Sequence, residues 1–260
     1  MTTPIAAVDP RFSEPEKTSS ERAYRLLRED IVSGGLAPGL KLKVEMLRQR
    51  YGLGAGPLRE ALSRLSSDRL VILEGQRGFE VAPMSMDDAR DIGNVRRMLE
   101  AEALAISIEN GDDEWEGDVV AAYHRLERVE RRMEMGDRDF PEWEARNRQF
   151  HHALVKACGS VWLMRLRAQM FDQHERYRRL SRVTSVGLRD ISAEHKALLT
   201  AAIDRDVAGA RGLIAQHIQR TPDTVIAALT TGDQVAPLTE TPGRRRRVSA
   251  RPAVPTEPTA

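Results

Sequence analysis

The chain has little cysteine, few aromatic residues and no long apolar run. Its single cysteine, Cys158, excludes an intramolecular disulfide and a zinc site made only of cysteines. Nowhere do about 18 apolar residues follow one another, so we expect no membrane-spanning helix. The N-terminus has no basic start followed by an apolar stretch, which argues against a signal peptide. These absences predict a soluble cytoplasmic protein.

The composition favours helices, and the net charge does not point to a partner. Aromatic residues make up 5% of the chain, and the 41% hydrophobic share is mostly Leu, Ala, Val and Ile. Charged residues make up 30%, yet the formal net charge is only +1. A nucleic-acid partner must therefore be argued from local charge. A length of 260 residues allows one large domain or two ordinary ones.

The two ends differ from the middle. Residues 1–17 carry three prolines and no periodic pattern, which predicts a disordered leader. We predict a similar tail at 232–260, where five prolines accompany the run Arg244–Arg247. That run is either a solvated basic segment or a source of extra phosphate affinity. Between the ends the pattern changes near residue 84, which predicts one domain at 18–84 and another at 85–231.

The first domain reads as a winged helix-turn-helix. Thr18–Ser20 offer N-caps for a helix that Gly34 and Gly35 stop, and a short helix is expected at Val44–Arg50. A glycine-bearing turn and a further helix follow. LVILE and FEVA, on either side of GQRG, predict two strands joined by a turn.

The second domain is helical almost throughout, beginning at Ser85, with Asp88 in a capping-box position. We predict a long helix through Ile108 and further helices at 113–135, 140–157, 160–182, 190–204 and 206–230. The predicted fold is mainly α, with an N-terminal winged helix-turn-helix and a C-terminal six- to seven-helix antiparallel bundle.

The stretch YGLGAGPLREAL predicts the start of a DNA-recognition helix. Its glycines allow positive φ and a tight reversal, and Pro57 suits the first turn of a helix. Leu58 to Leu65 place their apolar side chains on one face, which leaves Arg59 and Arg64 to reach phosphate or a guanine edge. Residues 21–83 hold eleven Lys and Arg against eight Asp and Glu, a local excess of +3, whereas residues 84–231 carry −3. The candidate DNA contacts are Arg48, Arg50, Gly54, Ala55, Gly56, Arg59, Arg64 and, at the tip of the wing, Gln76, Arg77 and Gly78. Taken alone, each of these arginines is more often a solvated surface residue than a DNA contact.

The histidines suggest a second site. Asn147 and His151 are four residues apart on one predicted helix, and His195 and His217 lie on two later helices. Three imidazoles from antiparallel helices can hold Zn²⁺ or a similar ion and leave positions open. From spacing alone, a histidine on a helix is more often an ordinary surface or core residue than a metal ligand. We expect His124, His152 and His174 to be ordinary, the three tryptophans, Trp115, Trp143 and Trp162, to pack in the bundle, and Cys158 to be a packing residue.

ERAYRLLREDIVSGGLAPGLKL, YGLGAGPLREALSRL and LVILEGQRGFEVAPMS resemble the winged-helix region of GntR-type bacterial transcription regulators. RRMLEAEAL, NRQFHHALVKACGS and EHKALLTAAIDRDVAGARGLIAQHI resemble the helical effector-binding domain of the FadR subgroup. The resemblance covers about residues 20–220. LGxGPLREAL and GDDEWE are similar to the dicarboxylate-responsive (glutarate-type) repressors of this family. The family usually has Ser-Arg where this chain has Gly54-Ala55, so its DNA contacts should shift to Arg59, the local backbone and the wing.

The resemblance implies a metal and an effector. In metal-binding members of the FadR subgroup, an Asp or Asn and three histidines form the site, and these match Asn147, His151, His195 and His217. Whether Asn147 coordinates the ion or lines the pocket stays open, because Asn is a neutral and poorer ligand than Asp. Arg96 is a candidate partner for an effector carboxylate, since a guanidinium can pair with it bidentately. An interhelical salt bridge is the alternative role for Arg96.

These observations predict a one-component transcription regulator, a repressor, that binds a double-stranded DNA operator as a homodimer and senses a small carboxylate, such as a dicarboxylate, through a divalent metal ion. Paired half-sites require two-fold symmetry. Two alternatives remain at this stage. One is a metal-dependent hydrolase, which would need a general base beside the ion; Glu194 adjoins His195 but is expected to face elsewhere, since neighbouring helix positions diverge by about 100°. The other is a helical interaction scaffold without a DNA role.

Overall fold

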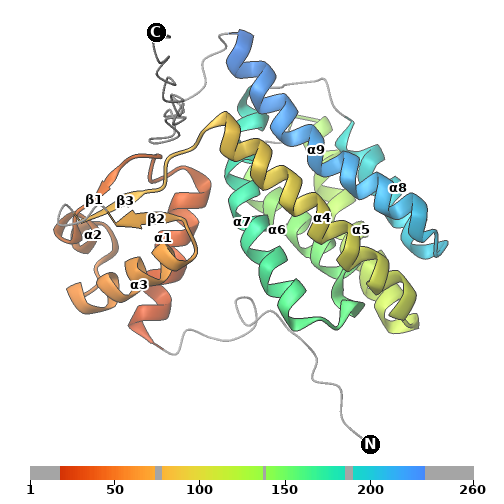
Figure 1. Cartoon of the computed structure of the whole chain (residues 1–260), viewed down its shortest axis with the longest axis horizontal. Coiled ribbons are helices and arrows are strands. Elements are labelled where there is room, and N and C mark those ends of the chain that lie inside the picture. The colour runs from red at the N-terminus through yellow and green to blue at the C-terminus, as the bar shows by residue number, and fades with distance from the viewer. Residues whose placement is uncertain (1–17, 74–77, 137–138, 185–189, 232–260) are drawn as a thin grey trace, which may run out of the picture.

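The computed structural model describes residues 18–73, 78–136, 139–184 and 190–231. Within these residues the protein is mainly helical, with a small N-terminal group of helices and strands beside a larger helical bundle (Figure 1). The expected leader at 1–17 and tail at 232–260 lie outside the described residues. No helix in the described part is both long and apolar enough to cross a bilayer.

The N-terminal group has the order of a winged helix-turn-helix. In chain order it contains α1 (Ser19–Ser33), β1 (Lys41–Leu42), α2 (Val44–Tyr51), α3 (Ala55–Ser67), β2 (Val71–Leu73) and β3 (Phe79–Val81). α1 begins in a capping box, in which the Thr18 hydroxyl accepts from the Glu21 amide at 3.1 Å and the Glu21 carboxylate accepts from the Thr18 amide at 3.1 Å. The three strands form an antiparallel sheet in the order β1-β3-β2, with Lys41 opposite Glu80 and Val71 opposite Val81.

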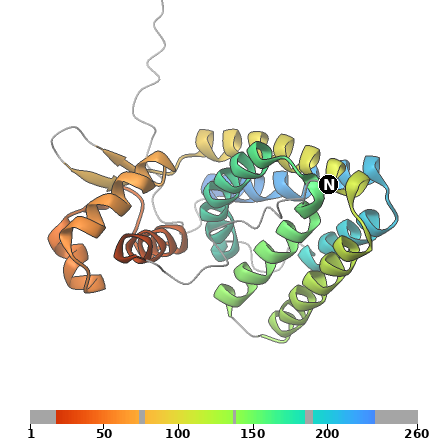
Figure 2. The ribbon, with the colours of Figure 1, turned by 90° about the horizontal axis from the view of Figure 1, so that it is seen from below.

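The C-terminal bundle confirms the predicted fold class. It contains α4 (Met86–Asn110), α5 (Asp113–Glu134), α6 (Phe140–Leu154), the short 3-10 helix η2 (Lys156–Cys158), α7 (Val161–Thr184), α8 (Ile191–Ile203) and α9 (Val207–Thr231). The helix expected at 140–157 ends at Leu154, and η2 completes the segment before Gly159, whose φ is +70°. α4 packs against both α7 and α9, as Figures 1 and 2 show.

Each part has its own apolar core. In the winged helix, Leu27, Leu47, Leu58 and Leu62 are fully buried, because the apolar faces of α1, α2 and α3 meet there. The bundle core is built around residues such as Leu104, Val119, Phe150 and Leu198. Burial of these side chains supplies most of the driving force for folding of both parts.

The two parts meet at α7 and at the start of α4. A third apolar cluster lies at this junction and consists of Met84, Ala89, Ile92, Tyr177 and Val225. α7 also contacts α1 of the winged helix directly. Close to this junction α4 approaches α9 at Gly93, where an added Cβ would lie 3.0 Å from Cγ of Pro222. An alanine there would require the Pro222 ring to give way by a few tenths of an ångström, so the two helices approach closely at this point.

Candidate DNA-reading surface and buried three-histidine centre

The turn before α3 places a polar helix face on the surface. α2 ends at Tyr51 and is capped by Gly52, whose φ of +66° is the left-handed conformation that favours glycine. Of the three glycines expected to use such a conformation, only Gly52 does so: Gly54 is the N-cap of α3 with φ −67°, and Gly56 lies within the helix. The inner face of α3 is buried, while Arg59 is exposed. α3 therefore has the geometry of a helix that could enter a groove.

The candidate DNA contacts differ in what else they touch. Arg59 makes no hydrogen bond or ion pair with any described residue, so its guanidinium is available to a partner molecule. Arg48, also exposed, pairs with Glu45 on its own helix at 2.9 Å. Arg50 has an internal partner, because its Nε donates to Asp30 at 2.9 Å, and this hydrogen bond raises the pKa of Arg50. The Arg64 guanidinium lies 4.1 Å from the centre of the Tyr24 ring.

The wing is only partly described. Gln76 and Arg77 lie outside the described residues, whereas Gly78 is described and has a φ of +95°. Ala55 and the two flanking glycines offer only a methyl group and backbone at the beginning of α3. Backbone N–H groups at a helix N-terminus can approach a phosphate closely.

Three histidines converge inside the bundle. His151 comes from α6, His195 from α8 and His217 from α9, and one ring nitrogen of each lies within 4.8 Å of the others. The ring centroids are 4.9 to 5.6 Å apart. The structure thus brings together the three imidazoles that the sequence places on separate helices.

Several polar atoms around this centre lack partners within the described part of the chain. Both ring nitrogens of His151, Nε2 of His195 and both amide atoms of Asn147 are buried and have no hydrogen-bond partner among the described residues. Asn147 lies one helical turn before His151, on the same face of α6. A buried polar atom without a partner costs about 1–3 kcal/mol. A metal ion would satisfy three of them, the unprotonated ring nitrogen of His151, Nε2 of His195 and Oδ1 of Asn147, so the donor set fits the predicted Zn²⁺ or similar ion.

Two carboxylates orient the imidazoles. Nδ1 of His195 donates to Oε1 of Glu130 at 2.8 Å, and the same oxygen accepts from Nε1 of Trp143 at 3.1 Å. Nδ1 of His217 donates to Oε2 of Glu194 at 2.8 Å. With Nδ1 protonated, the Nε2 atoms carry the lone pairs, which is how carboxylate–histidine pairs prepare a metal site. The sequence analysis expected Glu194 to face away from the histidine centre, and this expectation is wrong. Its carboxylate reaches across to His217 on α9, a contact that its position on α8 does not reveal.

The third imidazole is held neutral by its surroundings. Burial is the main reason that the pKa of His151 lies well below its usual value of 6.5, and the nearby His217 and Arg96 lower it further. Neutral imidazole is the form that binds a metal. The centre is therefore ready to bind an ion at neutral pH without first losing a proton from His151.

A buried arginine cluster lies beside the histidines. Arg96 is fully buried, pairs with Glu100 one turn along α4 at 3.1 Å, and burial lowers its pKa to about 9, so it stays charged at neutral pH. The Nε of Arg167 donates to the other oxygen of Glu100 at 2.8 Å, and its Nη2 donates to the backbone carbonyl of His151 at 2.8 Å. Two guanidinium groups thus share one carboxylate next to the histidine centre. The salt bridge of Arg96 is within one helix rather than between two.

His174 belongs to this cluster, although the sequence analysis treated it as ordinary. Nη1 of Arg96 donates to its Nδ1 at 2.7 Å, so its Nε2 carries the proton and donates to the Ile218 carbonyl at 3.3 Å. That carbonyl is free because Pro222, four residues later in α9, has no N–H to offer it. A proline inside a predicted helix was the one sequence signal that a carbonyl of α9 needs an outside partner.

The remaining aromatic and sulfur residues divide as follows. Trp115 and Trp143 are buried in the bundle, as expected, and so is Cys158. The expectation for Trp162 is wrong, because its side chain is 71% exposed in the first turns of α7. His152 is half-buried and His124 is exposed. His124 borders a surface hollow of about 560 Å³ on the outside of α5, and none of the residues named above for the histidine centre lines it.

Comparison with protein families decides the identity of the chain. The family described as "Bacterial regulatory proteins, gntR family" matches residues 19–81, and the FCD domain family matches residues 91–220. The chain belongs to the GntR family of bacterial regulators. Two family members are similar over most of their length. The uncharacterized HTH-type transcriptional regulator BphR of Paraburkholderia xenovorans is 45% identical over 200 residues, which are 76% of this chain and 82% of BphR. The HTH-type transcriptional repressor GlaR of Escherichia coli is 39% identical over 214 residues, which are 81% of this chain and 96% of GlaR.

A solved structure agrees on the fold of this GntR-family chain. McbR/YncC of E. coli superposes with a TM-score of 0.70 at 21% identity, covering 84% of this chain and all of McbR/YncC. BphR, GlaR and McbR are all named transcription regulators. The chain is thus a DNA-binding transcription regulator with an FCD domain. This family membership argues against both alternatives, the metal-dependent hydrolase and the scaffold without a DNA role.

Proposed function

We propose that this GntR-family regulator is a homodimeric, cytoplasmic repressor whose affinity for a double-stranded DNA operator is controlled by a small dicarboxylate. The effector binds in the FCD domain at a divalent metal ion held by the three-histidine centre. The name of GlaR as a repressor supports the sign of regulation. A single winged helix makes few base contacts, and a two-fold pair of half-sites requires a dimer.

Exposure and internal partners divide the proposed DNA contacts. Arg59, exposed on α3, reads a base edge or a phosphate, and Arg48 contacts the backbone of the duplex. The N–H groups from Gly54 to Gly56 approach a phosphate at the N-terminus of α3. Arg50 and Arg64 have partners within the domain, so they stabilise the DNA-binding domain and do not make the main contacts with DNA. Gln76, Arg77 and Gly78 form the wing contact.

The proposed metal ligands are His151, His195, His217 and the side-chain oxygen of Asn147. The observation that supports this proposal is that three buried acceptor atoms at one centre, a ring nitrogen of His151, Nε2 of His195 and Oδ1 of Asn147, have no hydrogen-bond partner among the described residues. Imidazole nitrogen suits Zn²⁺ and related ions. When bound, the ion would supply positive charge and open coordination positions for an oxygen ligand.

The charge around the centre favours an anionic effector. Asn147 is neutral, so none of the four proposed ligands carries a negative charge. Arg96 and Arg167 share the single carboxylate of Glu100, so one guanidinium charge beside His151 is not balanced by Glu100, while Glu130 and Glu194 are bonded to Nδ1 of His195 and of His217. A carboxylate on the ion would balance this charge, and a second carboxylate would pair with Arg96. This arrangement supports a dicarboxylate over a neutral ligand.

Two measurements test the proposal. Thermal unfolding should show that Zn²⁺ raises the melting temperature and that glutarate raises it further only when Zn²⁺ is present. The monocarboxylate butyrate, which has one carboxylate fewer, is the matched control and should give a smaller shift. Fluorescence anisotropy with the DNA upstream of the chain's own coding region should show weaker binding when glutarate and Zn²⁺ are added. If a chelator changes neither the melting temperature nor the response to glutarate, the metal has no part in effector binding.

A further inference from the structure

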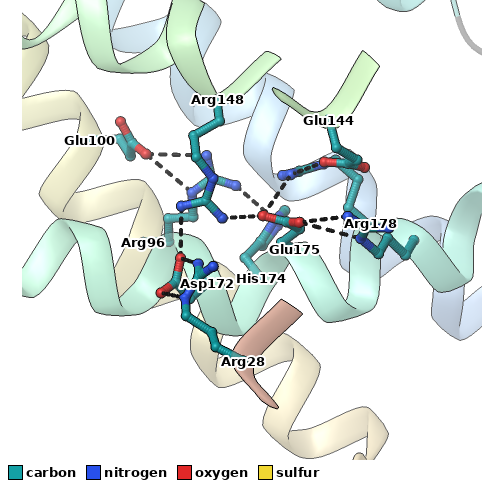
Figure 3. Close-up of polar contacts among 10 residues, drawn as sticks. Arg28, Arg96, Glu100, Glu144, Arg148, Asp172, His174, Glu175 and Arg178 are labelled. Atoms are coloured by element: carbon teal, nitrogen blue, oxygen red, sulfur yellow. Dashed lines mark hydrogen bonds and ion pairs between the residues drawn. The ribbon is translucent and has the colours of Figure 1, made fainter. Parts of the chain in front are cut away.

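One carboxylate connects the two parts of the molecule. Asp172 of α7 accepts from Arg28 of α1, with Nε 3.0 Å from Oδ2 and a second contact to Oδ1. The same Oδ1 accepts from Nη1 of Arg148 on α6 at 2.7 Å. Figure 3 shows Asp172 between the two guanidinium groups. Its side chain is only 6% exposed, so both contacts are shielded from solvent.

Each arginine belongs to a different functional part. Arg28 lies on the helix that packs against α3 of the DNA reader. Arg148 follows Asn147 directly and also pairs with Glu175. Its guanidinium lies 4.6 Å from the centre of the Phe171 ring, and the guanidinium of Arg96 lies 4.3 Å from the same centre. Arg148 is thus part of the arginine cluster beside the histidine centre.

α7 has one face for each part. Gln173 donates to the carbonyl of Asp68 at 2.8 Å, and the hydroxyl of Tyr177 accepts from the amide of Ser85 at 3.1 Å, so this face touches the winged helix and the junction. Phe171 and His174 occupy the other face, toward the arginine cluster. A small displacement of α7, or of a charge on it, therefore changes contacts with both the winged helix and the arginine cluster.

We infer that Asp172, by holding Arg28 and Arg148 on one carboxylate, couples the effector site to the placement of the DNA reader. The inference rests on the proposed function. An anionic effector near Asn147 attracts Arg148 away from both of its carboxylate partners, Asp172 and Glu175. Asp172 then no longer divides its charge between Arg148 and Arg28, so Arg28 holds it more tightly and the reader is fixed more firmly in its docked position. The effector can control DNA binding in this way only because the docked and undocked states differ in their affinity for it.

The sharpest test is Arg28→Gln, because Arg28 lies outside the arginine cluster and the effector site stays intact. In wild-type protein, glutarate with Zn²⁺ should weaken binding to the upstream DNA by about 5- to 150-fold, the usual range of allosteric coupling. In R28Q that ratio should fall at least threefold towards one, while calorimetry without DNA shows that glutarate still binds, weakened by no more than the factor lost from the ratio, as reciprocity requires. Asp172→Asn should reduce the ratio as well, and R28Q/D172N should reduce it no further than D172N alone. Arg28→Lys, which keeps the charge, should restore part of the response.

Arg25→Gln is the matched control. Arg25 lies on the same helix one turn earlier, and pairs with Glu29 of that helix at 3.6 Å. Its replacement removes the same charge from the reader, so it corrects for a general loss of attraction to phosphate. R25Q should keep the wild-type ratio. A wild-type ratio in R28Q and D172N would overturn the inference.

Hydrogen exchange without ligand separates this inference from the proposed effector. The amide of Ser85 is bonded across the junction to Tyr177, so weaker docking should speed exchange in residues 82–88 of R28Q by at least about tenfold, but not in R25Q. If wild-type protein ignores glutarate, the proposed effector is wrong, and the coupling contact is supported or overturned by exchange alone. Unchanged exchange in R28Q would show that Arg28 and Asp172 do not hold the reader.

Discussion

Replacing His151 by alanine should remove most of the stabilisation that zinc gives this protein. The side chain is 1% exposed, its two ring nitrogens have no partner among the described residues, and its ring centroid lies 5.0 Å from that of His217. If Zn²⁺ binds at this centre, His151 supplies one of three nitrogen ligands. Its loss should weaken zinc binding by at least about 100-fold, the upper end of what loss of a mere ligand-orienting partner costs.

The expected magnitude follows from mass action. At a free zinc concentration about 100 times Kd, the wild-type protein gains about 2.7 kcal/mol, or roughly 5–11 °C in melting temperature for a protein of this size. A 100-fold weaker site at the same concentration gains about 0.4 kcal/mol, or roughly 1–2 °C. The alanine also removes buried atoms and changes the stability of the metal-free protein. The diagnostic quantity is therefore the zinc-induced shift within each variant.

The assay is thermal unfolding in zinc and in chelator. His152→Ala is the matched control, since His152 is the next residue on α6, is half-buried and points about 100° away around the helix. H152A should keep the full zinc-induced shift, and H151A should lose most of it. Equal shifts in wild type and H151A would place zinc elsewhere and refute the reasoning from the unpaired buried nitrogens.

Three further results are expected. In chelator, Asn147→Asp should lower the melting temperature, because it buries a carboxylate. In zinc, the same substitution should raise the melting temperature above that of wild type, because Asp is the stronger ligand. A change of the same sign in both conditions would contradict Asn147 as a ligand. Burial holds the pKa of His174 well below 6.5. Below pH 6.5, the unfolded chain therefore binds a proton at this residue that the folded chain does not. As the pH is lowered, the free energy of unfolding should fall by up to about 1.4 kcal/mol per pH unit for this residue. His174→Gln should reduce that slope in urea titrations from pH 6.5 to 5, and an unchanged slope would show that His174 titrates normally when folded. Arg59→Ala should weaken binding to the upstream DNA by at least about 1 kcal/mol while Arg25→Ala has less effect, and equal affinities by anisotropy would exclude Arg59 as a base contact.

Local signals in the sequence predicted the helices well. Thr18 and Ser85 accept from backbone amides at the starts of α1 and α4, because a short polar side chain satisfies an N–H that has no partner within the helix. The spacing of Asn147 and His151 also acts locally. Residues four positions apart lie about one helical turn apart, so both side chains project from one face of α6.

Partners that lie far apart in the chain left no such signal. Glu130 is 65 residues from His195, and Arg28 is 144 residues from Asp172. Each of these side chains has several rotamers and several possible neighbours until the helices pack. The same is true of Glu194, whose neighbour His195 points to the ion centre while its own carboxylate crosses to His217.

The sequence by itself determined the order of elements, the apolar faces that build two cores, and the residue types that could read DNA or hold a metal ion. These depend on spacings of a few residues, which the backbone geometry of a helix or strand converts directly into position. Only the tertiary structure decided that Glu130 and Glu194 orient the imidazoles, that Trp162 is exposed, and that Asp172 lies between the two arginines. Those contacts arise when whole helices pack, and packing is governed by the sum of many weak contacts rather than by any local pattern.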